Sequence, residues 1–208
     1  MIASILQASR VLPVVTAQDV GATVELARAL QRGGMGAIEI TLRTPAALDS
    51  ICAVQSEVPG MLVAAGTVTN PAELEQVLAT GVKLALSPGS TPALLQAAAQ
   101  ADMDFIPGVA SASEVMLGLD YGFKLFKLFP AQVLGGRAML KALGGPFPHI
   151  QFCPTGGLNR DNFQEYLALP NVICCGGSWM VGRELIDNNK WSEIEALARA
   201  AMADHEAT

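Results

Sequence analysis

The sequence predicts an α/β fold, a single (β/α)8 TIM barrel with an N-terminal helix and an extra C-terminal helix, formed as one domain by residues 1–208. From Val11 onward one unit recurs: a short apolar run, a polar turn with a helix-capping residue, a helical pattern, and a glycine or polar break. Eight such units in 208 residues match a compact barrel. No Pro/Gly/Ser-rich tract or charge block divides the chain. A doubly wound open sheet is the alternative, but no G-x-G-x-x-G follows the first strand.

The first two units carry helix-start signals directly after their strands. The apolar run 11–15 is followed by Thr16 and Asp19, whose spacing predicts a capping box for a helix that ends near Gly33. The second strand is predicted over 37–42, and Thr44-Pro45 predicts an N-cap with proline at the first helical position.

The next three units repeat the same pattern, with strands predicted over 62–65, 84–86 and 105–107. Their helices are predicted to start at Asn70-Pro71, at Thr91-Pro92 and at a capping box of Ser111 with Glu114. These helices end at Gly81, Asp102 and Gly122.

The last three units are less regular. Strands are predicted over 123–129, 150–153 and 172–175. Helices are predicted over 137–143, 160–167, 180–187 and 191–203, the last being the extra C-terminal helix.

A lysine lies inside the sixth apolar run. Lys127 stands between Phe126 and Leu128, in a stretch that otherwise has the near-continuous apolar character of a buried parallel strand. A cation there is costly unless it is paired or loses its proton. One interpretation is a lysine that snorkels its ammonium to the surface, and the other is a functional amine.

Glu39 is a carboxylate in the interior of the second predicted strand. Buried carboxylates are rare without a partner or a task. A structural ion pair, with Lys127 itself as partner, is one interpretation; a nucleophile and its proton shuttle, pointing into one barrel, is the other. Arg43 follows four residues later on the same face, and its guanidinium suits a carboxylate or phosphate.

Further binding residues are predicted at the ends of three other strands, where barrels place their active sites. Thr67 offers a hydroxyl after the third strand. The alternative interpretation is that this threonine only shapes the turn. Paired glycines follow the seventh strand, at Gly156-Gly157, and the eighth, at Gly176-Gly177-Ser178. Their backbone N–H groups can approach an anion closely, and a helix N-terminus just behind adds a favourable dipole. Barrels commonly bind phosphate at these two loops.

Composition narrows the function. A net charge of −6 without a basic stripe argues against nucleic acid as a partner. No segment is long and apolar enough for a membrane span or a signal peptide, so we expect a cytoplasmic protein. The four cysteines are expected to be buried thiols. His149 and His205 lie away from the expected site, and no metal-ligand cluster is evident, so no metal and no cofactor is expected. An imine on lysine is then the available electron sink.

The sequence resembles the 2-keto-3-deoxy-6-phosphogluconate (KDPG) aldolases, which are class I aldolases. Two long motifs carry the resemblance, Gly34 through Glu39 to Arg43 and Gly122 through Lys127 to Gly135. Shorter matches support it at residues 66–68, 87–89, 154–157 and 176–179.

The resemblance implies that Lys127 forms the imine with the C2 ketone of a phosphorylated keto acid, that Glu39 moves protons, and that Arg43 and Thr67 hold the carboxylate. It implies that Pro88 and Phe129 line the pyruvyl pocket. It further implies a phosphate site at Gly156, Gly157, Gly177 and Ser178, and a homotrimer.

Three alternatives stay open: an aldolase for 2-keto-4-hydroxyglutarate or an epimeric sugar acid, a barrel isomerase that uses Glu39 without an imine, and a non-catalytic sugar-phosphate binding module.

Overall fold

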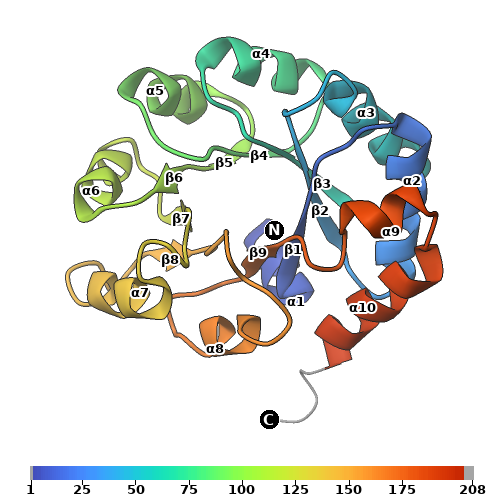
Figure 1. Cartoon of the computed structure of the whole chain (residues 1–208). Coiled ribbons are helices and arrows are strands. Elements are labelled where there is room, and N and C mark those ends of the chain that lie inside the picture. The colour runs from blue at the N-terminus through green and yellow to red at the C-terminus, as the bar shows by residue number, and fades with distance from the viewer. Residues whose placement is uncertain (1, 204–208) are drawn as a thin grey trace.

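The computed structural model describes residues 2–203, which form parallel strands surrounded by helices. The strands are β1 (Val11–Val15), β2 (Ala37–Thr41), β3 (Leu62–Gly66), β4 (Leu84–Leu86), β5 (Asp104–Ile106), β6 (Gly108–Val109), β7 (Leu125–Leu128), β8 (Gln151–Phe152) and β9 (Cys175–Gly177). The helices are α1 (Ile2–Ser9), α2 (Val20–Arg32), α3 (Ala47–Glu57), α4 (Pro71–Ala79), α5 (Pro92–Gln100), α6 (Ala112–Asp120), α7 (Gly136–Gly144), α8 (Phe163–Leu167), α9 (Arg183–Asp187) and α10 (Trp191–Ala203). Figure 1 shows the helices as a ring around the strands.

The strands form a curled arrangement of two hydrogen-bonded sheets. One has the order β5-β4-β3-β2-β1-β9, and the other has the order β6-β7-β8. Glu39 of β2 stands opposite Val14 of β1 and Ala64 of β3 in the first sheet. Lys127 of β7 stands opposite Gly108 of β6 in the second. The two charged residues singled out by the sequence therefore come from different sheets.

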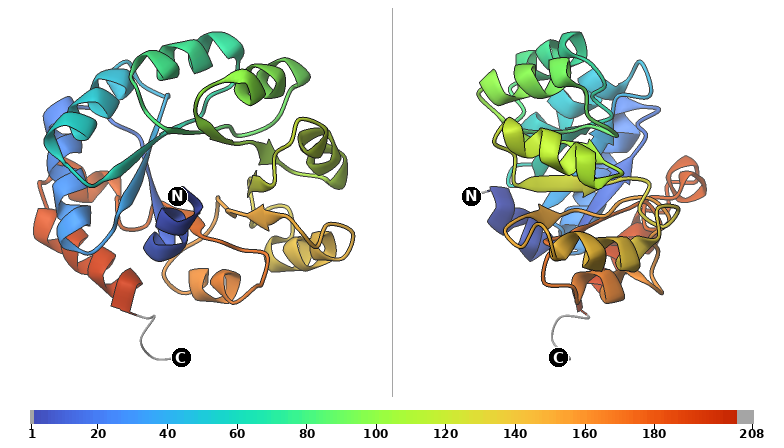
Figure 2. Two further views of the ribbon diagram at one scale, coloured as in Figure 1. Left: turned by 180° about the vertical axis from the view of Figure 1, so that it is seen from behind. Right: turned by 90° about the vertical axis from the view of Figure 1, so that its left-hand side faces the viewer.

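The space between the strands is filled by apolar side chains. Leu12, Ala64 and Leu84 are fully buried there, together with Leu6 of α1. Ile2 of α1 lies beside the starting ends of β4, β5 and β7, so this helix covers the end of the strands at which they begin (Figure 2). Burial of a side chain such as Leu6 contributes about 1.5–3 kcal/mol.

Most predicted elements lie where the sequence placed them, including α1 and α10 at the two ends of the chain. Asn70, Thr91 and Ser111 are N-caps, and each side chain accepts a hydrogen bond from the amide three residues on. The Glu114 carboxylate accepts a return bond from the Ala110 amide, one residue before the N-cap.

Two predicted helix starts are wrong. The N-cap of α2 is Asp19 itself, whose carboxylate accepts from the Ala22 amide, whereas Thr16 lies beside Thr41. Helix α3 starts at Ala47 after Ala46, without a side-chain cap, and the Thr44 hydroxyl donates instead to the carbonyl of Ala17. In both cases the threonine hydroxyl forms a hydrogen bond with a group in another strand or loop instead of capping the helix. Such contacts between segments cannot be predicted from the local sequence.

The last third departs further from expectation. Strand β8 has only two residues, the predicted strand 172–175 moves to Cys175–Gly177, and the predicted helix 160–167 shortens to Phe163–Leu167. Glycine has no side chain to signal a strand, so the sequence predicts a loop at Gly176 and Gly177, although both pair with β1.

The thiols also differ from prediction at one position. Cys153, Cys174 and Cys175 are buried and free, as expected, but Cys52 lies on the exposed side of α3. Among residues 2–203, no helix is long and apolar enough to cross a membrane.

Candidate active site

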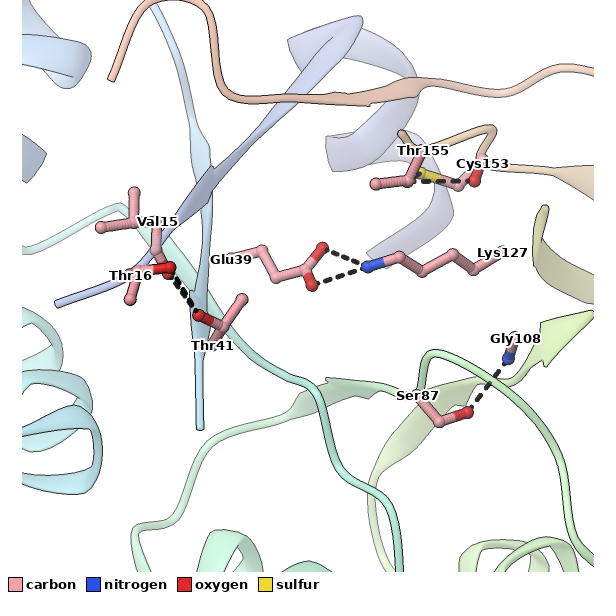
Figure 3. Close-up of polar contacts among 9 residues, drawn as sticks. All are labelled: Val15, Thr16, Glu39, Thr41, Ser87, Gly108, Lys127, Cys153 and Thr155. Carbon is pink, nitrogen blue, oxygen red and sulfur yellow. Dashed lines mark hydrogen bonds and ion pairs between the residues drawn. The ribbon is translucent and has the colours of Figure 1, made fainter. Parts of the chain in front are cut away.

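Lys127 and Glu39 meet between the two sheets. The Lys127 Nζ lies 2.7 Å from Oε1 and 3.1 Å from Oε2 of Glu39. Figure 3 shows the two side chains pointing at each other from β7 and β2. Relative exposure is 6% for the lysine side chain and 0% for the carboxylate. The lysine therefore does not snorkel to the surface.

This ion pair is weak evidence for a structural purpose. Removing two charges from water costs several kcal/mol per ion, and their mutual attraction offsets this cost only when the geometry is excellent. Apolar residues of similar volume at the two positions therefore often give equal or greater stability. The Lys127 ammonium also lies 5.8 Å from the centroid of the Phe129 ring, which offers a further favourable contact. A buried amine touching a carboxylate is an arrangement typical of a nucleophile and its proton shuttle.

Room for Glu39 depends on a glycine that the sequence did not single out for this purpose. Gly66, at the end of β3, lies so close that a Cβ there would be 2.2 Å from Glu39 Oε1. Any larger residue would have to displace the carboxylate. The signal available in the sequence was only the glycine in Gly66-Thr67-Val68.

A cavity of about 150 Å³ opens above Lys127. Five of the predicted binding residues line it with the lysine: Arg43, Gly156, Gly157, Gly177 and Ser178. Phe129 lines it as well, as the resemblance implied. The structure thus brings together residues from β7 and β9 and from the loops after β2 and β8, although Arg43 is far from the glycine turns in the sequence.

Three further lining residues were not predicted as site residues, namely Val14, Thr155 and Leu158, and Gly176 lines the cavity as part of the predicted turn Gly176-Gly177-Ser178. Thr155 is almost buried, and its hydroxyl donates to the Cys153 carbonyl at 3.3 Å. A Cβ at Gly176 would lie 2.1 Å from this hydroxyl oxygen, so the glycine makes room for Thr155. The signals for Thr155 in the sequence were its position after a predicted strand and its place in the motif at residues 154–157.

Thr67 and Pro88 are not among the residues that line this cavity. Thr67 is half-buried, directly after β3, and has a φ of 63°. A left-handed conformation is uncommon for a β-branched residue, and such residues cluster at functional sites. Its place at the site remains a prediction.

The glycine turns offer backbone donors without the helix dipoles expected behind them. Among residues 2–203, the N–H groups of Gly156, Gly157 and Ser178 donate to no backbone carbonyl. Helices α8 and α9 begin only at Phe163 and Arg183, and each has five residues. Because the dipole effect falls off within one turn, it does not reach these glycines, and that part of the prediction is wrong.

The field of the ion pair extends to a neighbouring thiol. A hydrogen bond with Cys174 lowers the pKa of Cys153, burial opposes this, and the charge of Lys127 lowers the pKa while that of Glu39 raises it. Within residues 2–203, no group of three His, Cys, Asp or Glu side chains could hold a metal. His149 is exposed and lines no part of the cavity, and His205 lies outside the described residues.

Comparison with known proteins gives the family. The family model described as KDPG and KHG aldolase matches residues 2–197. A relative from Pseudoalteromonas atlantica, named 2-dehydro-3-deoxy-phosphogluconate aldolase, is 49% identical over 193 residues, which are 93% of this chain and 90% of that protein.

Two solved structures have the same fold. KDPG aldolase from Legionella pneumophila, with pyruvate captured at low pH as a covalent carbinolamine intermediate, gives a TM-score of 0.94 at 45% identity and covers 97% of this chain and 98% of its own. The Zymomonas mobilis enzyme with 3-phosphoglycerate gives 0.91 at 41% identity, with 97% and 95% covered. The chain belongs to the KDPG and KHG aldolase family.

Proposed function

We propose that this chain is a class I aldolase that cleaves 2-dehydro-3-deoxy-6-phosphogluconate to pyruvate and glyceraldehyde 3-phosphate. The observation that carries the proposal is the contact of Glu39 with the amine of Lys127, which lines the cavity, whereas Glu39 itself is not among the lining residues. The relatives named for this reaction, and the covalent carbinolamine in the Legionella relative, support it.

The first step is imine formation. A neutral Lys127 amine attacks the C2 ketone and gives a carbinolamine, and loss of the C2 hydroxyl as water gives the imine. Glu39, at 2.7 Å from Nζ, accepts the proton that the amine loses and returns one to the departing hydroxyl. The cationic imine then serves as the electron sink for the bond that breaks.

The second step breaks the bond between C3 and C4. A base removes the proton of the C4 hydroxyl, the C4 carbonyl of glyceraldehyde 3-phosphate forms, and the electron pair of the broken bond passes to the imine nitrogen as an enamine. Protonation of the enamine at C3 and addition of water at C2 release pyruvate and regenerate the amine. We assign these proton transfers to Glu39, because it is the acid-base group in contact with Nζ.

The two ends of the substrate are assigned to different loops. Arg43 lines the cavity and holds the carboxylate, with Thr67 as a second donor. The backbone at Gly156, Gly157 and Gly177 and the hydroxyl of Ser178 hold the phosphate. Pro88 and Phe129 enclose the pyruvyl part. The 3-phosphoglycerate in the Zymomonas relative supports a phosphorylated ligand.

We propose that the two sheets are parts of one closed (β/α)8 barrel in one domain. Pro107 alone separates β5 from β6, so the two can be counted as one strand of eight. Parallel bridges between Phe152 and Val172 and between Thr155 and Gly176 support closure on the other side.

We further propose that the lyase works without a metal, because the Lys127 imine supplies the electron sink. Unchanged turnover after dialysis against EDTA would support this. A homotrimer is proposed from the resemblance, and light scattering would test it. The cytoplasmic location stays a prediction.

Borohydride trapping tests the reaction class. With pyruvate and sodium borohydride, we expect loss of activity and mass addition of a reduced pyruvyl group on the peptide that contains Lys127. Without such an adduct, the imine proposal fails and the isomerase or the binding module becomes the better interpretation. Release of pyruvate from the substrate, coupled to lactate dehydrogenase, separates these two from the aldolase.

A second substrate is favoured by the family description, which includes 2-keto-4-hydroxyglutarate (KHG). Its distal group is a carboxylate, to which the same N–H groups could donate hydrogen bonds. We expect a higher kcat/KM for the phosphorylated substrate, because a dianionic phosphate gains more from the donors of both glycine turns. An equal or higher value for 2-keto-4-hydroxyglutarate would reverse the assignment.

A further inference from the structure

The position of Lys127 relative to Glu39 depends on how the two sheets are joined. Glu39 belongs to the six-stranded sheet and Lys127 to the three-stranded one. Along the chain the sheets meet between β5 and β6, where Pro107 separates Ile106 from Gly108. This junction lies one residue from the partner of Lys127 in the ladder, so its geometry affects the reacting pair directly.

The regular ladder between β4 and β5 stops at this junction. The Asp104 amide donates to the Lys83 carbonyl, and the alternation of a parallel ladder would bring the Gly108 amide to the Ser87 carbonyl. Instead, the Gly108 amide donates to the Ser87 hydroxyl oxygen at 3.0 Å (Figure 3). A side chain therefore replaces the backbone acceptor, and the Ser87 side chain is fully buried.

A second serine holds the other polar group of Gly108. The Ser90 hydroxyl donates to the Gly108 carbonyl at 2.7 Å. The backbones are in close contact here, because a Cβ on Gly108 would lie 2.3 Å from the carbonyl carbon of Pro88. Both backbone groups of Gly108 thus bind hydroxyls from the loop after β4.

Gly108 and its neighbour in turn hold Lys127. Gly108 is the ladder partner of Lys127, and the Lys127 amide donates to the Pro107 carbonyl at 2.9 Å. A continuous path of short contacts therefore runs from the loop after β4, through the two serine hydroxyls and the backbone of Gly108 and Pro107, to the backbone of the lysine.

We propose that Ser87 and Ser90 are positioning residues that set the Lys127 amine against Glu39 and the substrate. This inference rests on the proposed aldolase function. Neither serine lines the cavity, so both act through Gly108 and β7 rather than by touching the substrate. A displacement of about 1 Å at a reacting group can lower the rate by up to roughly a hundredfold. The two serine hydrogen bonds that fix Gly108 can therefore affect the rate measurably.

The test uses Ser87→Ala, Ser90→Ala and the double variant in the full chain. Ser50→Ala is the matched control: Ser50 is also fully buried, but its hydroxyl has no hydrogen-bond partner among the described residues. For each protein, kcat and KM are measured well below its unfolding midpoint, and the rate of borohydride trapping is measured at saturating pyruvate. We expect Ser87→Ala to lose roughly tenfold in kcat and in trapping rate, with KM changed less than twofold, because alignment rather than binding is impaired.

The outcomes separate this inference from the proposed function. If wild-type protein forms no adduct with pyruvate, the aldolase proposal itself is at fault. If wild type is trapped and folded Ser87→Ala keeps kcat within twofold, or if Ser50→Ala loses as much, the positioning role is overturned. Should Ser87→Ala fail to fold, Ser90→Ala decides, since Ser90 is only half-buried: a loss of threefold or more in kcat at unchanged KM supports the role, and a smaller loss overturns it.

Discussion

At the scale of single residues, the Glu39 carboxylate touches the Lys127 ammonium with both oxygens and has no exposed surface. We predict that Glu39→Gln keeps the fold, because the amide has the same shape and retains an oxygen acceptor toward Lys127. Turnover should fall by about 10²-fold or more, the usual contribution of a positioned acid-base group. Steady-state kcat checks this, with circular dichroism to verify folding. An unchanged kcat would return the pair to a structural role.

Gly66 provides a second prediction at this scale. A methyl group in Gly66→Ala would lie 2.2 Å from Glu39 Oε1, so the carboxylate must move away from Lys127. We expect kcat to fall by about tenfold or more, since misplaced catalytic groups lose rate steeply. Gly21→Ala, where the nearest atom is 3.4 Å away on an exposed helix turn, is the control and should retain full activity. Equal kcat values for the two variants would contradict the steric argument.

The sequence predicts some site residues and misses others for a physical reason. Lys127 and Glu39 were evident because a charge inside an apolar strand is costly without a partner or a function. Gly66, Thr155 and the close packing of Gly176 against Thr155 carry no such signal, because their importance lies in distances between strands and loops that are not adjacent in the sequence. Such contacts become visible only when the strands are placed side by side.

At the scale of elements, the start of α2 separates two interpretations of one motif. The Asp19 carboxylate accepts from the Ala22 amide at 2.8 Å, so we predict that Asp19→Ala destabilises the protein by about 1 kcal/mol, the typical loss for a removed N-cap. Thr16→Ala should cost less, because Thr41 keeps its stronger bond to the Val15 carbonyl at 2.8 Å. Urea unfolding measures both. A larger loss for Thr16→Ala would restore Thr16 as the cap.

Element prediction was best where local signals are strong. The caps at Asn70, Thr91 and Ser111 were predicted correctly. Each side chain accepts a hydrogen bond from an amide only three residues away, so the local sequence is enough to predict the contact. Prediction was poorest for β8, α8 and β9, which are two to five residues long and depend on pairing with distant strands. Short elements contribute too few side chains to give a period.

At the scale of the whole molecule, the candidate site lies between two sheets, so its geometry depends on both of their junctions. One junction is the serine-braced Gly108, and the other consists of the parallel bridges near Thr155 and Gly176. The sequence predicted eight units and a barrel, yet contained no clear sign that the hydrogen bonding would be interrupted beside Lys127. Pro107 was the one hint, but proline is also found at the ends of strands whose ladders continue undisturbed, so it does not by itself predict a break.

Stability of the whole fold should decline at alkaline pH because of a buried thiol. Burial raises the pKa of Cys175 well above its ordinary value, and the thiol donates to the Phe163 carbonyl at 3.7 Å. Above the ordinary thiol pKa of about 8.5, the unfolded chain has lost this proton while the folded chain retains it. The unfolded state then binds fewer protons, so the free energy of unfolding falls as pH rises, by up to about 1.4 kcal/mol per pH unit for one group.

Cys175→Ser isolates this contribution, because serine keeps a donor for Phe163 and does not titrate in this range. We predict that the variant loses stability less steeply than the wild type between about pH 8.5 and pH 10.5, when urea unfolding is measured at each pH under reducing conditions. Cys52→Ala, which removes an exposed thiol, should follow the wild-type curve. Because Cys174 is also buried and its pKa is also raised, the stability of Cys175→Ser should still fall with pH, with a smaller slope. A slope equal to that of the wild type would show that the Cys175 thiol titrates alike in the folded and unfolded chains.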